Sequence, residues 1–183
     1  MATKRKTYSL RQGEVIDVEE YHDGNYGAPG KKRTKKAKPT KEQMQWVNAM
    51  NKARKARVRL LEYFNLGDCF ATWTYEVQNR PPDMKAALKH FQAAMRFVRK
   101  EYKKRGKELF WIRNIECGTK GAWHIHLVIN EIGDTVSILE KAWEHGITYC
   151  SAIRKNGKVY DEDFSKLASY ITKDEHTRYK KAN

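Results

Sequence analysis

The stretch Trp123-His124-Ile125-His126-Leu127-Val128-Ile129 places two histidines two positions apart in an apolar run that is rich in β-branched residues. Successive side chains of a β-strand point to opposite faces, so we expect His124 and His126 to project together from one face. The apolar residues at the alternate positions are expected to pack on the other face. Two imidazoles held side by side on a rigid strand can ligate a metal ion. A polar, solvent-exposed strand face is the alternative interpretation of this pattern.

The segments around this strand alternate between strand and helix patterns. Apolar residues recur at three- and four-residue intervals after Asp83, which we expect to be the N-cap of a helix that ends at Gly106. The order β-α-β-β-α-β, followed by a helix, is typical of an α+β fold, a ferredoxin-like split βαβ antiparallel sheet with helices packed on it. The other strands are predicted over 69–76, 109–117 and 147–153, the other helices over 136–145 and 164–173, and a hairpin turn at 156–157.

The first 66 residues differ in composition from the remainder of the chain. We expect a basic, flexible N-terminal extension over 1–40 with one short strand at 14–21, a basic helix within 41–66, and the main domain over 67–183. A block of like charges is usually disordered alone and often acts as an arm on nucleic acid, although a solvated linker is the alternative. The block consists of Lys31, Lys32, Arg33, Lys35 and Lys36. The apolar stripe predicted for the helix consists of Met44, Val47, Met50, Ala53, Val58, Leu61 and Phe64.

Composition limits the class of protein. The chain has 183 residues, 40% of them hydrophobic, and a formal net charge of +15, so it can form a core and favours a polyanionic partner, nucleic acid above all. A ribosome-associated or merely soluble basic protein is the alternative. The three cysteines are dispersed without a CxxC pair, which argues against a disulfide scaffold or zinc ribbon and fits a reducing cytoplasm. We expect neither a secretory signal nor a membrane span, because no apolar run has the required place or length.

The turn before the histidine strand decides whether a third ligand joins them. Residues 119–121 suit a three-residue hairpin loop in which Gly121 takes the left-handed conformation of a G1 bulge. With that loop, Glu116 lies directly opposite His124 and shares its face. A two-residue turn would instead place Glu116 on the face of Trp123, and the site would fail. Two histidines and one carboxylate leave coordination positions open and suit Mn²⁺, or Mg²⁺ when phosphate oxygens complete the shell.

The last predicted helix carries a candidate nucleophile. Tyr170 lies at the edge of its apolar stripe, and Lys173 follows one turn later, so that the two side chains are neighbours on the helix surface. Tyrosine is a poor nucleophile at neutral pH, because its pKa is near 10. A metal ion that polarises the attacked phosphorus, together with a nearby lysine, can lower the barrier. The alternative is a tyrosine that flanks the core and a lysine that is merely a surface charge.

Taken together, these residues resemble the HUH endonucleases, the rolling-circle replication initiators and their relatives. Three segments match the family motifs in order: 70–75 the first motif, an apolar strand with threonines, 123–127 the histidine–hydrophobic–histidine motif, and 170–173 the tyrosine motif. Glu116 precedes the histidines at the place where many initiators carry their third ligand. The resemblance spans about residues 70–173, and the joint match in order is more specific than any one motif.

The resemblance implies a mechanism. Single-stranded DNA is expected to lie across the sheet, and the metal held by Glu116, His124 and His126 is expected to polarise the scissile phosphate. Tyr170 would attack, leaving a 5′-phosphotyrosine link and a free 3′-hydroxyl that primes synthesis or rejoins the strand, while Lys173 steadies the phosphate. The expected DNA contacts on the matched domain are Thr72, Thr74 and Lys120, in addition to the basic block of the extension.

The resemblance also implies a setting for this chemistry. The chain has no GxxxxGK[ST] motif, so a host helicase and polymerase are expected partners for unwinding and copying an origin hairpin. One tyrosine stands in the motif, and Tyr179 lies nine residues further on, past the expected end of the helix. The closest likeness is to small initiators of plasmids, filamentous-phage-like elements and integrative elements, which act in the cytoplasm of a bacterial host cell.

Three alternatives remain open at the level of sequence. A transposase or a relaxase of the same superfamily would use the same chemistry. A two-histidine, one-carboxylate iron oxygenase is a different enzyme class, and the basic composition argues against it. A ferredoxin-like nucleic-acid-binding module without catalysis would stack bases on aromatic side chains such as Trp111 and Trp123, but it would leave the histidine pair without a role.

Overall fold

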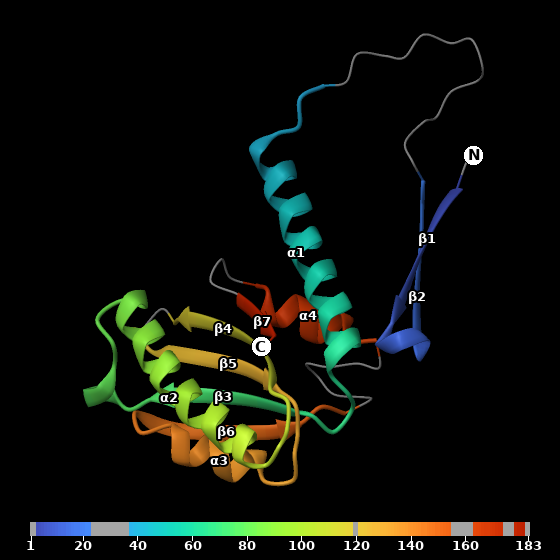
Figure 1. Cartoon of the computed structure of the whole chain (residues 1–183). Helices are drawn as coiled ribbons and strands as arrows, with labels where there is room; N and C mark the ends of the chain where they lie inside the picture. The colour runs from blue at the N-terminus through green and yellow to red at the C-terminus, as the bar shows by residue number, and fades with distance from the viewer. Residues whose placement is uncertain (1–2, 23–36, 119–120, 155–162, 174–177, 182–183) are drawn as a thin grey trace, which may run out of the picture. The chain divides into compact units, whose positions relative to one another are not determined.

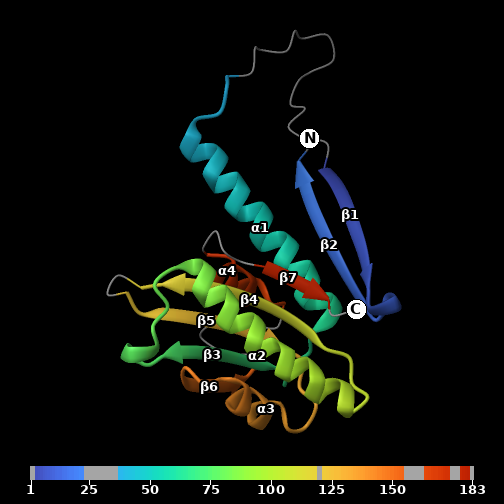
Figure 2. The same ribbon diagram turned by 60° about the vertical axis from the view of Figure 1, so that its left-hand side comes forward.

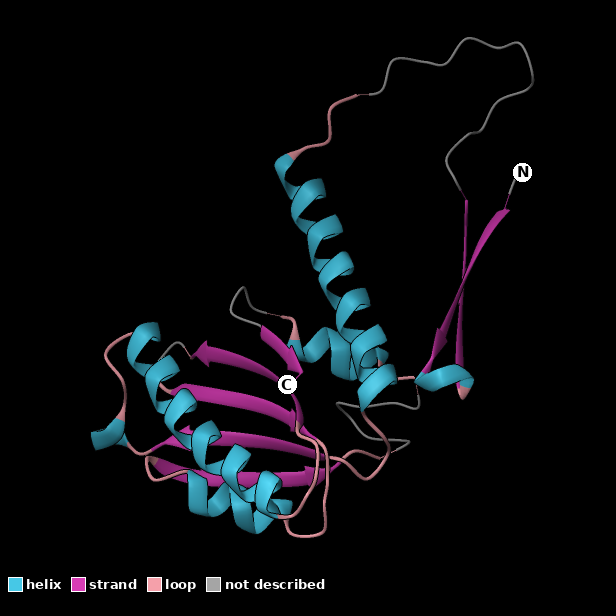
Figure 3. Cartoon of the chain, in the orientation of Figure 1, coloured by secondary structure: helices cyan, strands magenta, loops and turns pink. Residues whose placement is uncertain are grey.

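The structure is a computed structural model that describes residues 3–22, 37–118, 121–154, 163–173 and 178–181 (Figures 1 and 3). It is an α+β fold with one five-stranded and one two-stranded sheet. No helix in the described ranges has the length and apolar content needed to cross a membrane. The elements are β1 (Thr3–Leu10), η1 (Arg11–Gly13), β2 (Val15–His22), α1 (Lys41–Tyr63), β3 (Cys69–Tyr75), η2 (Val77–Asn79), α2 (Met84–Lys104), β4 (Phe110–Cys117), β5 (Trp123–Ile129), α3 (Thr135–Ala142), β6 (Gly146–Ala152), α4 (Ser165–Ile171) and β7 (Arg178–Lys181).

The chain divides into two compact units, residues 1–51 and 52–183. The first contains an antiparallel hairpin in which β1 pairs with β2 from Thr3 opposite His22 to Leu10 opposite Val15. The prediction of a single strand at 14–21 was therefore incomplete, and it missed β1. The β1 sequence is mostly charged and polar and has no alternating apolar residues, so its pairing could not be seen in the hydrophobic pattern. The basic block at 31–36 lies outside the described residues.

The second unit contains the predicted ferredoxin-like sheet. Its strand order is β6-β3-β5-β4-β7, and each neighbouring pair is antiparallel. The first four strands in this order reproduce the split βαβ arrangement, because β5 lies between the two strands that α2 connects. Strand β7 extends the sheet past β4 and was not predicted, since its sequence RYKK carries three charges and no apolar alternation. The hairpin predicted around 156–157 lies outside the described residues.

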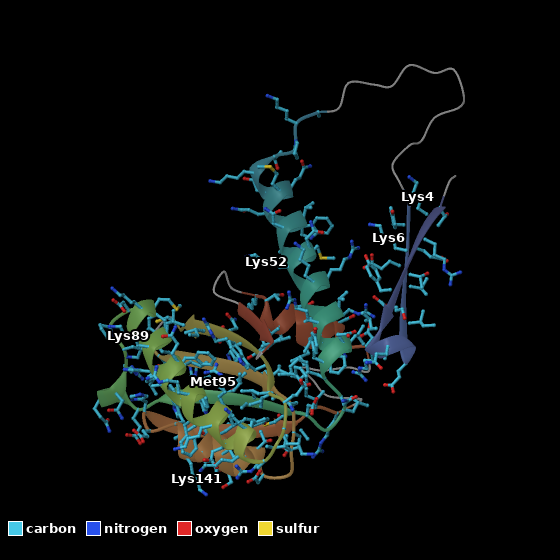
Figure 4. The ribbon with its side chains drawn as sticks, viewed as in Figure 1. Lys4, Lys6, Lys52, Lys89, Met95 and Lys141 are labelled. Carbon is cyan, nitrogen blue, oxygen red and sulfur yellow. The ribbon has the colours of Figure 1, made fainter. Side chains whose placement is uncertain are left out.

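One face of the sheet packs against α2 and α3. Trp73 of β3 is fully buried and stacks on Trp143 after α3, with ring centroids 4.8 Å apart and an interplanar angle of 2°. Helix α2 begins at the predicted N-cap, where the Asp83 carboxylate accepts a hydrogen bond from the Ala86 amide. In Figure 4, Met95 of α2 lies over the sheet, whereas Lys89 lies at the margin of the molecule. This face and its helices form the main hydrophobic core.

The other face of the sheet is only partly covered. Helix α4 lies on this side, opposite α2 and α3 (Figure 2), and its Leu167, Ala168 and Ile171 are buried. The second half of α1 belongs to the same unit, and Arg57 there forms an ion pair with Asp163 at 3.5 Å. The predicted stripe of α1 was right for its second half only. Leu61 and Phe64 are buried, but Met44, Val47 and Met50 are 46–55% exposed.

The two faces give a matched test of the core. Ile125 on β5 is fully buried under the helices, whereas Ile147 on β6 is 68% exposed on the other face. Ile125→Ala is expected to lower the free energy of unfolding by about 2–5 kcal/mol, since it removes buried methyl groups and leaves a cavity. Ile147→Ala is expected to cost at most about 1 kcal/mol, the range of β-propensity. Urea denaturation measures both, and equal losses would contradict the assignment of the two faces.

Histidines and aromatic residues gather at one end of the packed face. The rings of His90 on α2 and His145 before β6 stack with centroids 3.9 Å apart, and the Tyr75 ring lies 5.8 Å from that of His145. Burial lowers the pKa of His145 below its ordinary value, and the neighbouring His90 adds to the effect. A histidine of this kind resists protonation in the folded chain more than in the unfolded chain.

Stability should therefore fall with acidification. As the pH drops from about 6.5, the unfolded chain takes up a proton at residue 145 before the folded chain does, so the unfolded state is stabilised relative to the folded state. His145→Gln is expected to make the decline in the urea midpoint between about pH 6.5 and 5 shallower. An unchanged slope would show that this imidazole has the same proton affinity in both states.

Candidate active site on the open sheet face

The hairpin between β4 and β5 has the register that the sequence predicted. Glu116 pairs directly with His124, and Asn114 pairs with His126. At the turn, the Gly118 amide donates a hydrogen bond of 2.7 Å to the Ala122 carbonyl, and Gly121 has a φ of +69° in the left-handed region. The predicted role of Gly121 and the placement of Glu116 opposite His124 are thereby confirmed. The two residues between these glycines lie outside the described residues.

Two rows of side chains cross the face that carries the histidines. Strand β5 pairs with β3, and β3 pairs with β6, so each row continues over four strands. Cross-strand partners share a face, and every member of a row therefore points to the same side. The first row is Glu116, His124, Thr74 and Ile147, and the second row is Asn114, His126, Thr72 and Tyr149.

Threonines on β3 hold the inner nitrogen of each imidazole. Thr72 Oγ1 lies 3.0 Å from Nδ1 of His126, and Thr74 Oγ1 lies 3.3 Å from Nδ1 of His124. Hydrogen bonding at one ring nitrogen fixes the orientation of the ring and the role of the other nitrogen. The sequence analysis expected these two threonines to contact DNA, which remains a prediction, whereas their bonds to the histidines were not anticipated.

The carboxylate of Glu116 meets one of the two imidazoles. Its Oε1 lies 2.8 Å from Nε2 of His126, which is buried, whereas Glu116 is half-buried. Because a carboxylate only accepts hydrogen bonds, Nε2 of a neutral His126 donates to it, and the Thr72 hydroxyl donates to Nδ1. Burial lowers the pKa of the neighbouring His124, with a further contribution from His126, so His124 favours the neutral form. Neutral imidazoles are the form that binds metal ions.

Tyr170 reaches this group of residues from α4. Its ring makes an edge contact with His126 at 5.3 Å between centroids and another with Phe70 at 5.9 Å. The side chain is 37% exposed, at the edge of the buried stripe as predicted. Burial raises the pKa of the Tyr170 phenol, and the negative charge of Glu116 raises it further. The hydroxyl is therefore protonated at neutral pH and needs help to act as a nucleophile.

The lysine of the tyrosine motif follows directly after the helix. The Lys173 amide donates a hydrogen bond of 3.4 Å to the Tyr170 carbonyl, and the residue is exposed. This places Lys173 close to Tyr170 along the chain on an accessible surface. Of the other predicted DNA contacts, Lys120 and the five basic residues of the block at 31–36 lie outside the described residues.

The donor set suits a divalent cation, although the side chains are not arranged around one. Within the described ranges, no three His, Cys, Asp or Glu side chains form a group that could hold a metal ion, and Glu116 and His126 are hydrogen-bonded instead. Two imidazoles and one carboxylate are nevertheless ligands that Mn²⁺ accepts, and the threonine hydroxyls already orient both rings. A cation bound here would replace the hydrogen bond between Nε2 and Oε1 and release its proton.

The structure adds one polar residue to the site that the sequence analysis did not select. Asn114 is 1% exposed on the same face as His126, and its Oδ1 has no hydrogen-bond partner among the described residues. Buried amide oxygens are nearly always paired, so this residue is unusual. Its position opposite His126 follows from the hairpin register, and the register could have identified it.

Comparison with known proteins relates the second unit to one family. A family model for the replication-associated protein ORF2 matches residues 68–175, which is more than half of the chain. The match includes both rows of the sheet face and Tyr170. No curated protein and no solved structure gave a significant match.

The threonine bonds to the imidazoles can be tested directly. Thr72→Val keeps the shape of the side chain but removes the oxygen that lies 3.0 Å from Nδ1 of His126. We expect the affinity for Mn²⁺, measured by calorimetry, to fall about 10- to 100-fold, the usual cost of losing a partner that orients a ligand. Thr148→Val on β6 is the control, because Thr148 pairs with Trp73 on the packed face. Equal affinity in both variants would contradict a positioning role for Thr72.

Proposed function

The chain belongs to the replication-associated protein ORF2 family, and on this premise we propose that it is a replication initiator endonuclease that nicks one strand of origin DNA and rejoins it. The observation that carries the proposal is the contact of the Tyr170 ring with His126, which is itself hydrogen-bonded to Glu116. A candidate nucleophile and candidate metal ligands thus meet on one sheet face from three separate elements. A chance alignment of motifs in sequence would not require this convergence.

The three ligands in this proposal are Glu116, His124 and His126, and the metal is Mn²⁺ or Mg²⁺. When bound, the cation polarises the scissile phosphate and stabilises the charge that develops on its oxygens. Thr72 and Thr74 keep the two rings in the orientation that leaves Nε2 for the metal. The partly buried position of Glu116 limits competition from water and strengthens its interactions.

Tyr170 is the nucleophile in this proposal. Its phenolic oxygen attacks the phosphorus and loses its proton to solvent, the bond from phosphorus to the 3′-oxygen breaks, and that oxygen takes up a proton. The products are a 5′-phosphotyrosine link and a free 3′-hydroxyl, and attack by the hydroxyl on the link rejoins the strand. One phosphodiester bond replaces another, so no ATP is required. Lys173 supplies positive charge beside the phosphate.

The substrate in this proposal is single-stranded or hairpin origin DNA. A net charge of +15 favours association with a polyanion and makes binding dependent on salt. The sequence has no GxxxxGK[ST] motif, the phosphate-binding loop on which many helicases rely. A helicase and a polymerase of the host would therefore unwind and copy the nicked DNA.

A covalent adduct on a denaturing gel tests the nicking chemistry. Incubated with Mn²⁺ and single-stranded DNA from its own locus, the chain should form an adduct that EDTA prevents. Tyr170→Phe should reduce adduct formation at least about a thousandfold, because it removes the attacking oxygen. Tyr149→Phe is the control, since Tyr149 is another exposed tyrosine on the same face, and it should leave the yield unchanged.

Two outcomes would count against the proposal. An adduct that survives Tyr170→Phe would place the nucleophile elsewhere. Tight binding without any adduct would favour the second candidate function, a ferredoxin-like nucleic-acid-binding module. The hydrogen bond between Glu116 and His126 is the observation that favours this second candidate, because it occupies two of the three proposed ligands.

A further inference from the structure

Strand β6 presents two large apolar side chains to solvent beside the candidate site. Tyr149 is 64% exposed and Ile147 is 68% exposed, although both lie on a strand of the main sheet. They end the two side-chain rows of the open face, where Tyr149 pairs with Thr72 and Ile147 pairs with Thr74. Large apolar groups exposed together near a functional site indicate a binding surface.

Burial along the face shows which way a bound strand can leave the site. Phe70, Ile112 and Val128 are at most 6% exposed, and α4 brings Tyr170 onto this covered side. In the opposite direction, Thr72 and Thr74 are half-buried and the β6 residues are exposed. A ligand held at His126 therefore has open sheet surface between the site and β6.

The exposed pair suits the bases of a single strand of nucleic acid. An unpaired base has an apolar face that stacks on aromatic side chains, while its backbone favours basic surroundings. Exposed Arg80 lies close enough to His124 for its charge to lower the pKa of that imidazole. Among the described residues of strands β3 to β6, Tyr149 is the one exposed aromatic side chain on this face.

The tryptophans that the sequence analysis considered for stacking do not have this exposure. Trp111 is 7% exposed and belongs to the core under α2, where its ring lies 5.3 Å from that of Phe91. Trp123 is partly buried and packs against the same core. Both face away from the histidines, because they occupy the alternate positions of their strands.

We propose that Tyr149, with Ile147 beside it, is a stacking platform for a base of the single strand that crosses the sheet next to the scissile phosphate. The platform lies two strands from His126 in the same row, a distance of about 10 Å at the usual strand spacing. This inference rests on the proposed function in one respect, namely that the substrate is single-stranded DNA. Stacking does not depend on base identity, so the platform sets position rather than sequence preference.

Binding to two probes that differ only in their bases tests the platform. The full chain is titrated, in EDTA, into a fluorescent oligothymidylate of about 16 nucleotides and into a backbone of equal length without bases. Tyr149→Ala should weaken binding to oligothymidylate roughly 5- to 150-fold, the range for loss of one stacked base, and leave binding to the abasic strand unchanged. Tyr149→Phe keeps the ring and should bind both probes within about twofold of the unaltered chain.

Phe97→Ala is the matched control, because Phe97 is an aromatic residue of α2 that is 37% exposed on the other side of the unit. It should bind both probes as the unaltered chain does. The platform is ruled out if Tyr149→Ala binds oligothymidylate normally, or if it loses affinity equally for both probes. These measurements require no strand cleavage, so a failed platform and a failed nickase give different results: the first leaves the Tyr170 adduct intact, and the second leaves base-dependent binding intact.

Discussion

The pairing of β4 with β5 is the constraint on which the candidate site depends. A strand that slips by one residue turns every side chain to the other face, so this one register decides whether Glu116 joins His124 or lies under α2. The left-handed conformation of Gly121 sets the turn that fixes the register. The same pairing places Asn114 opposite His126, and through β3 it extends both rows to β6. A single glycine thus determines which polar groups meet.

The two faces of the sheet serve different purposes, and the division explains the unusual polarity of the open one. The packed face buries Trp73 and Ile125 completely, which stabilises the sheet as a rigid support. The open face can then carry hydroxyl, imidazole and carboxylate groups whose hydrogen bonds are made among themselves, from Thr72 through His126 to Glu116. Helix α4 covers one side of that face and supplies Tyr170, so the proposed nucleophile lies beside the proposed ligands.

Much of the second unit could be predicted because its strands and helices alternate apolar residues with the periods of their structures. The place of Glu116 followed from one loop length, and Tyr170 at the edge of a buried stripe followed from helical spacing. Strands β1 and β7 escaped prediction because backbone pairing, not an apolar pattern, forms them. The roles of Thr72 and Tyr149 depend on neighbours on other strands, which local sequence patterns do not specify. The exposed first half of α1 shows that a periodic apolar stripe does not ensure burial.

The central claim is that the hairpin register assembles a metal site from Glu116, His124 and His126. Anomalous diffraction from a crystal of the chain soaked in Mn²⁺ tests it most directly, because the signal locates the ion without reference to activity. The account predicts one strong peak in contact with the carboxylate and both imidazoles, with the hydrogen bond between His126 and Glu116 broken. A peak elsewhere, or an intact hydrogen bond at saturating Mn²⁺, would contradict it.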